Sequence, residues 1–249
     1  MSKFIDALKR AAIPPATSIG FQTKNIARRN SQLLVVASVV SDSKKALKTI
    51  GTAGLDAILV RLHAQFDLSE IRKAVGDVPA GLRLDVKDME SELTASVDFI
   101  VYSMKMPVSF LNKATVGKVM EIEPSLDLGS IRAINGVGSI VDAVMLGGDD
   151  VSFTVERLLY CQRISDLVTQ PVLVSVDSSV KGSELATLCE AGADGIVITD
   201  VCSASAYAEI RKAISGLPRN IKRKSAGTAI VPKLSGTPSV DEEEQEEDE

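Results

Sequence analysis

The sequence has 249 residues, 45% of them hydrophobic and 24% charged, which excludes a disordered chain, a collagen-like repeat and a disulfide-rich miniprotein. Its longest apolar run, LLVVASVV, is far shorter than the roughly 20 residues needed to cross a bilayer. The net charge of −5 is misleading, because eight of the 33 acidic residues lie in the last nine positions, 241–249. We expect a globular, membrane-free protein with a nearly neutral body and an acidic tail.

The first segment, MSKFIDALKRAAIPP, mixes charged and apolar residues at helical spacing and has no continuous apolar stretch. A secretory signal would need such a stretch, so we predict an N-terminal helix and a cytoplasmic protein. Three cysteines follow later, at Cys161, Cys189 and Cys202, in no metal-ligand or disulfide spacing. We expect all three to be buried thiols.

Eight short apolar runs then alternate with segments of helical pattern. The runs are LLVVASVV (33–40), AILVRL (57–62), GLRLDV (81–86), DFIVYSM (98–104), KVMEIE (118–123), DAVMLGG (142–148), PVLVSV (171–176) and DGIVIT (194–199). Their starts lie 17 to 29 residues apart, about the length of one strand, one helix and two loops. The pattern predicts an α/β fold, a single-domain (βα)8 TIM barrel. A doubly wound sheet is the main alternative, but the turn SVVSDS after the first run lacks its glycines.

Two helical segments carry clear signals. In FTVERLLYCQRISDLVTQ (153–170) we expect one broad apolar face, made of Phe153, Val155, Leu158, Leu159, Ile164, Leu167 and Val168. The last helix, within 203–218, should stop at Gly216. We divide the chain into an N-terminal helix and barrel-closing segment (1–32), the barrel (33–218), and a basic linker with a disordered acidic tail (219–249).

Active sites of such barrels lie at the carboxyl ends of the strands. His63 is the only histidine, which excludes multi-histidine metal sites, and no GxSxG motif indicates a serine hydrolase. The loops after the seventh and eighth runs, VDSSVKGSE and ITDVCSAS, give weak support for a phosphate site. A single basic stretch, only 4% aromatic residues and no tryptophan make nucleic acid an unlikely partner.

A carboxylate pair is the remaining signal. Glu121 and Glu123 are two residues apart in one strand, so both should point to one face, where one could meet Asp149 or Asp150 on the next strand. Such oxygen ligands suit Mg²⁺ or Mn²⁺. The alternative is a buried ionic layer in which these acids pair with inward basic side chains, namely Arg83, Lys87 or Lys118.

The segments IEPSLDLGSIRAI (122–134) and VDAVMLGGDDVS (141–152) resemble the HpcH/HpaI family of class II pyruvate aldolases, which is related to citrate lyase β-subunits. The resemblance implies that Glu123 and Asp150 bind a divalent metal. ILVRLHAQFDLSEI (58–71) is similar to the family's strand-two segment, which places His63 on its active-site histidine. GLRLDVKD (81–88) is similar to its strand-three segment, which places Arg83 on the arginine that holds the substrate carboxylate and enolate oxygen.

This resemblance implies a metal-dependent carbon–carbon lyase that acts on a small 2-oxo acid such as pyruvate through an enolate. Mg²⁺ or Mn²⁺ on Glu123 and Asp150 would chelate the substrate, Arg83 would stabilise the enolate, and His63 would move a proton. The alternative is a catalytically silent barrel that serves as a scaffold or interaction protein. An open carboxylate pair favours the enzyme, and a barrel mouth plugged by side chains favours the scaffold. The oligomeric state stays open, with a homo-oligomer as one option.

Overall fold

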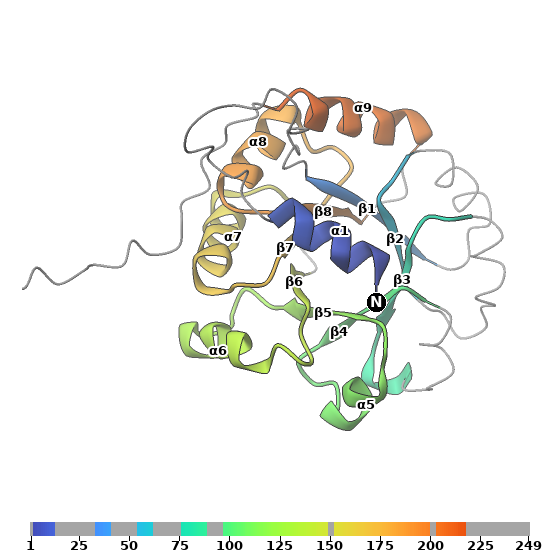
Figure 1. The fold of residues 1–249 in the computed structure, drawn as a ribbon. Helices are drawn as coiled ribbons and strands as arrows, with labels where there is room; N and C mark the ends of the chain where they lie inside the picture. Colours follow the sequence, from blue (N-terminus) through green and yellow to red (C-terminus); the bar gives the residue numbers. More distant parts are fainter. Residues whose placement is uncertain are drawn as a thin grey trace, which may run out of the picture.

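The computed structural model describes residues 2–12, 33–40, 54–61, 76–88, 97–148, 152–199 and 203–217. Eight parallel strands form a closed barrel in which neighbours in sequence pair and β8 returns to β1 (Figure 1). The strands are β1 (Leu34–Val40), β2 (Ala57–Arg61), β3 (Ala80–Leu84), β4 (Phe99–Ser103), β5 (Gly117–Ile122), β6 (Ala143–Leu146), β7 (Val172–Val176) and β8 (Gly195–Ile198). The eight predicted runs and the (βα)8 barrel are therefore confirmed.

The described helices lie on the outer side of this barrel, along the bottom, left and top of the view in Figure 1. They are α5 (Val108–Lys113), α6 (Leu128–Ala133), α7 (Val155–Leu167), α8 (Gly182–Glu190) and α9 (Ala204–Ser215), which follow β4 to β8 in turn, and two short 3-10 helices, η1 (Val86–Asp88) and η2 (Ile134–Val137). As predicted, α9 ends at Gly216. Every helix in the described part of the chain is too short or too polar to cross a bilayer. The basic linker and the acidic tail lie outside the described residues.

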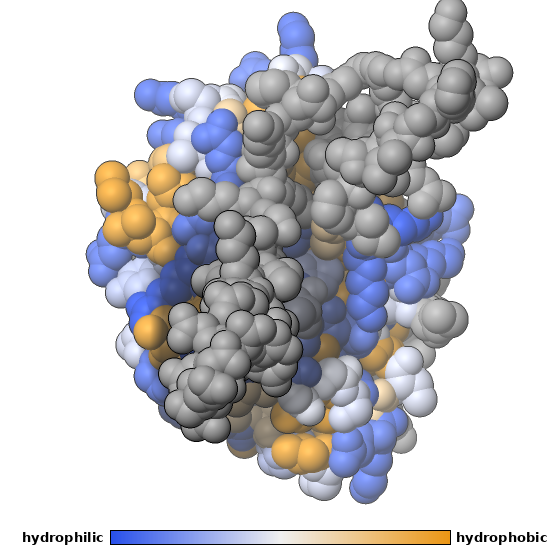
Figure 2. Space-filling model, turned by 60° about the vertical axis from the view of Figure 1, so that its left-hand side comes forward, coloured by the Kyte–Doolittle hydropathy of each residue, from blue (hydrophilic) through white to orange (hydrophobic). Residues whose placement is uncertain are grey.

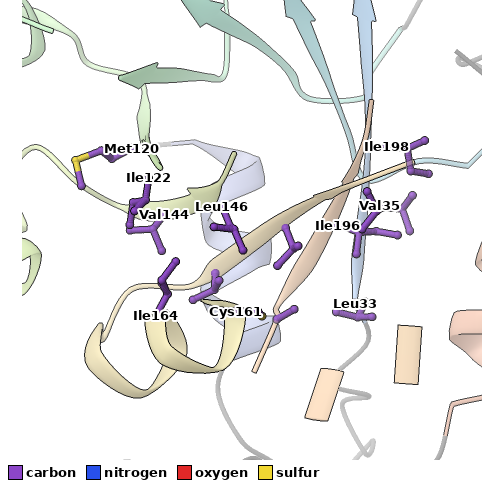
Figure 3. Packing of buried hydrophobic residues seen from close by; sticks show 14 of the residues in the cluster. Leu33, Val35, Met120, Ile122, Val144, Leu146, Cys161, Ile164, Ile196 and Ile198 are labelled. Carbon is purple, nitrogen blue, oxygen red and sulfur yellow. The ribbon is translucent and has the colours of Figure 1, made fainter. Parts of the chain in front are cut away.

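Alternation along the strands creates two cores, because successive side chains of a strand point to opposite faces. The outer core lies between strands and helices, and Figure 3 shows Cys161 and Ile164 of α7 beside Val144 and Leu146 of β6. The inner core fills the barrel with Val36, Leu59, Val101, Val119, Met145, Leu173 and Val197. Residues that continue the two-residue spacing of these inner side chains therefore point into the barrel at the carboxyl ends of the strands.

Helix α1 (Lys3–Ala12) closes the amino end of the barrel, and its Phe4, Ile5 and Leu8 belong to the inner core. The Phe4 ring lies 4.5 Å from the ring of Phe99, at the start of β4. Asp98 fixes the first turn of the helix by accepting hydrogen bonds from the backbone N–H of Lys3 at 2.8 Å and of Phe4 at 2.9 Å. These bonds satisfy donors that a helix start leaves unpaired.

The apolar face expected on α7 is wrong in part. Val155 and Leu159 are 73% and 63% exposed, while Arg157, Cys161 and Ile164 face the barrel and are buried. The cause is Arg157, whose guanidinium donates to backbone carbonyls at the ends of β6 and β7 and so sets the rotation of the helix. Figure 2 shows hydrophobic residues in separate patches on an otherwise hydrophilic face of the molecule.

The cysteine prediction is confirmed where the structure describes it. Cys161 in α7 and Cys189 in α8 are buried free thiols. The Cys161 thiol donates to the carbonyl oxygen of Ala191 at 3.7 Å, a weak bond typical of a buried thiol. Cys202 lies outside the described residues.

Candidate functional site

Charged side chains replace apolar ones at the carboxyl end of the inner barrel. Arg61 continues the inward phase of Leu59 in β2, and Glu121 continues that of Val119 in β5. In the β2–β3 ladder Arg61 is the register partner of Arg83. Arg61 is thus the last residue of β2 and Arg83 the last but one of β3, so both lie at the carboxyl end of the barrel, where active sites of this fold are built.

The Arg83 guanidinium reaches across β4 to β5. Its Nη2 donates to Glu121 Oε1 at 2.7 Å, and the two side chains are 29% and 12% exposed. Burial raises the pKa of Glu121 above its usual value, an effect that Asp85 adds to and that the positive charges of Arg83 and Arg61 oppose. The site thus contains a carboxyl group whose charged form is poorly solvated and is stabilised by the guanidinium groups of the two arginines.

Gly147, directly after β6, makes room for this carboxylate. A Cβ atom at position 147 would lie 2.0 Å from Glu121 Oε1 and 2.6 Å from its Cδ, well inside van der Waals contact. The Glu121 side chain therefore lies over the backbone of residue 147. Sequence reasoning missed this role, although a signal existed: Gly147 continues the inward phase of Ala143 and Met145 in β6.

Arg157 holds the same region from outside the barrel. Its Nε and Nη2 donate to the Ser175 carbonyl at 3.1 and 2.8 Å, and Nη2 also donates to the Leu146 carbonyl at 3.2 Å. A longer contact of 3.5 Å joins Nη1 to the Gly147 carbonyl. This buried arginine ties the end of β6 to the end of β7, a role that no local sequence signal predicted.

The residues predicted from the sequence divide into three groups. Arg83 lies inside the barrel mouth, but it pairs with Glu121, the arrangement expected of the alternative ionic layer. Glu123 follows the end of β5 and is exposed, so the two glutamates occupy different surroundings. His63 and Asp150 lie outside the described residues. Within the described ranges no group of three His, Cys, Asp or Glu side chains could hold a metal ion, and the site at Glu123 and Asp150 stays a prediction.

No family model and no curated protein sequence matches the chain. Similar solved structures include a variant tryptophan synthase α-subunit from Pyrococcus furiosus, with a TM-score of 0.58 and 15% identity over 75% of this chain and 98% of that chain. Thiamine phosphate pyrophosphorylase from Pyrococcus furiosus has a TM-score of 0.55 and 15% identity over 75% and 97% of the two chains. Native KDPGal has a TM-score of 0.53 and 16% identity over 79% and 96%. At these identities the similarity shows the barrel fold alone.

The expected membership in the HpcH/HpaI family is therefore wrong: no family model matches, and the similar structures named above belong to other barrel proteins. The physical reason is that the matching segments are short strand ends followed by turns. A parallel barrel places apolar residues followed by charged ones at such positions whatever its chemistry. The segments thus reflect the fold and not that family.

Proposed function

We propose that the chain is a lyase-type barrel enzyme that binds a small 2-oxo acid at the carboxyl end of its barrel. The observation that supports this most is the register pairing of Arg61 with Arg83 at the carboxyl ends of β2 and β3. Two planar guanidinium groups on adjacent strands suit a carboxylate and the oxo group next to it. Fold neighbours such as KDPGal and the tryptophan synthase α-subunit favour this class of barrel.

In the proposed reaction, the carbon–carbon bond of a 4-hydroxy-2-oxo acid breaks. A base, for which His63 is our candidate, takes the proton of the 4-hydroxyl group, and its oxygen forms the aldehyde carbonyl. The electrons of the broken bond move to the 2-oxo oxygen and form the enolate, which Arg83 and Arg61 stabilise as charge develops. Protonation of the enolate carbon then gives the 2-oxo acid.

The proposal includes a divalent metal ion beside the two arginines. Glu123 lies exposed at the mouth, and its hard carboxylate oxygens are of the type that Mg²⁺ and Mn²⁺ prefer. With Asp150 it would hold the ion, which would act as a Lewis acid beside the enolate oxygen. The described residues alone do not form such a centre.

A second candidate function is the silent scaffold. It is favoured by the Arg83–Glu121 ion pair, because a charged layer that is already internally paired needs no substrate. Turnover by the unmodified protein separates the two candidates, since a scaffold has no activity to lose.

The test is exchange of the methyl hydrogens of pyruvate with deuterated water, together with aldol cleavage over a panel of aldehydes, with and without Mg²⁺. We expect exchange by the unmodified protein and a loss of at least about tenfold in Arg61→Ala, because one of two enolate-stabilising cations is removed. Lys9→Ala, which breaks the Lys9–Asp142 ion pair at the other end of the barrel, is the matched control and should keep full activity. No exchange and no cleavage under any of these conditions would support the scaffold.

A further inference from the structure

We propose that a small monocarboxylate enters the barrel mouth by taking the place of the Glu121 carboxylate on Arg83. This inference rests on the proposed function, since both place a ligand carboxylate on Arg83. In addition, Glu121 competes with the ligand for Arg83, and the ligand binds by exchange with it.

A carboxylate already occupies Arg83. Arg83 Nη2 already binds a carboxylate oxygen at 2.7 Å, in a partly exposed ion pair. A guanidinium binds carboxylates through a planar set of N–H donors, and a ligand carboxylate needs the same donors. The Glu121 carboxylate therefore occupies the position on Arg83 that the carboxylate of a ligand would take.

Glu121 keeps this position because the residue beside it has no side chain. The side chain lies against Gly147, where a methyl group would overlap Oε1 at 2.0 Å and Cγ at 2.6 Å. Because the overlapping atoms belong to the end of a flexible side chain, a methyl group there would move Glu121 and leave the backbone in place. Gly147 thus permits the carboxylate to reach Arg83, and a change at this position releases it.

Charged groups around Glu121 indicate which ligands the barrel mouth favours. The positive charges of Arg61 in β2 and Arg83 in β3 act on Glu121, and the negative charge of Asp85, directly after β3, acts on it as well. A ligand with one negative charge brings to Arg83 the same charge that Glu121 presents there, while the displaced carboxylate stays near the positive charge of Arg61. A phosphate would bring additional negative charge close to Asp85, where like charges repel. The mouth therefore favours a monocarboxylate.

Calorimetric titration of the full chain with pyruvate tests the exchange. Glu121→Gln removes the competing charge while keeping the side-chain shape, and Gly147→Ala moves the intact carboxylate away. We expect both variants to bind pyruvate about tenfold more tightly than the unmodified protein, the effect of losing one charge-assisted competitor. Lys9→Ala should bind as the unmodified protein does, and inorganic phosphate should bind more weakly than pyruvate.

A gain of affinity is informative because a damaged site loses affinity. Thermal unfolding checks that each variant is folded, and either variant alone decides the question if the other is not. Unchanged or weaker pyruvate binding in the folded variants would overturn the exchange, and the proposed function would stand if the unmodified protein still turned over pyruvate. Absence of both binding and turnover in every protein would overturn both. Tighter binding of phosphate than of pyruvate would overturn the ligand class.

Discussion

The two ends of the barrel use the same strands and the same inward alternation for opposite purposes. At the amino end, Gly81 and Gly117 leave space that the Phe99 ring and the Ile5 side chain fill, each within 2.5 Å of where a Cβ would stand. At the carboxyl end, Gly147 leaves space for the carboxylate of Glu121. The absence of a Cβ atom thus makes room for apolar side chains at the amino end and for a charged side chain at the carboxyl end.

This difference separates stability from recognition. Apolar side chains close the amino end, because α1 packs Phe4, Ile5 and Leu8 into the inner core. The carboxyl end keeps a partly exposed ion pair, which contributes little to stability but offers groups that a ligand can bind. Changes at the amino end should therefore alter unfolding, and changes at the carboxyl end should alter binding and turnover.

The largest expected effect on stability is that of Phe4→Ala. Phe4 is completely buried and its ring contacts that of Phe99, so removing it leaves a cavity in the seal. We expect a loss of about 3 to 5 kcal/mol in the free energy of unfolding, measured by denaturant titration. Val155→Ala, at a position that is 73% exposed, is the control and should change it by less than about 0.5 kcal/mol. A loss below about 1 kcal/mol for Phe4→Ala would show that α1 does not seal the barrel.

A smaller effect is expected for Asp98→Ala. The Asp98 carboxylate accepts hydrogen bonds from two backbone N–H groups of α1 and from the Ser2 hydroxyl at 2.7 Å. Their loss should lower the free energy of unfolding by about 1 to 2 kcal/mol, as for other helix caps. Lys3→Ala, which keeps the backbone donor, is the matched control. Equal unfolding curves for the two variants would contradict the capping role.

The smallest of these effects is a change in the pH dependence of stability. The pKa of Glu121 is raised by burial, so the folded state favours its protonated form. The contribution of this group to the free energy of unfolding is complete below the pKa that Glu121 has in the unfolded chain. It is lost as pH rises through the pKa that Glu121 has in the folded state. Glu121→Gln, which cannot ionise, should therefore gain stability relative to the unmodified protein between acidic and neutral pH. A difference in melting temperature that stays constant over this range would contradict the burial of a charged Glu121.

The barrel could be predicted from the sequence because its signals are local. Eight runs of β-branched residues at regular spacing specify strands, and Gly216 marks the end of α9 without reference to any distant residue. The exposed face of α7 could not be predicted in the same way. Arg157 is buried there because of carbonyls in β6 and β7, which only the folded barrel brings within reach.

The site was predictable only as a choice between two arrangements. The spacing indicated that Glu121 and Glu123 share one face, and pairing of these acids with an inward basic side chain such as Arg83 was one of the two outcomes considered. The contact with Gly147 was not foreseen, because it joins β5 to the end of β6 through a side-chain conformation. Short motifs also suggested a family that the comparisons do not support, since such motifs describe strand ends and not a specific chemistry.

The most direct test of the account is Arg83→Lys, with melting temperature and pyruvate exchange measured on the same preparation. Lysine keeps the positive charge beside Glu121, so the free energy of unfolding should change by less than about 1 kcal/mol. It lacks the planar fork, so turnover should fall at least about a hundredfold. Unchanged turnover in Arg83→Lys, or no exchange by the unmodified protein, would contradict a substrate site at the barrel mouth.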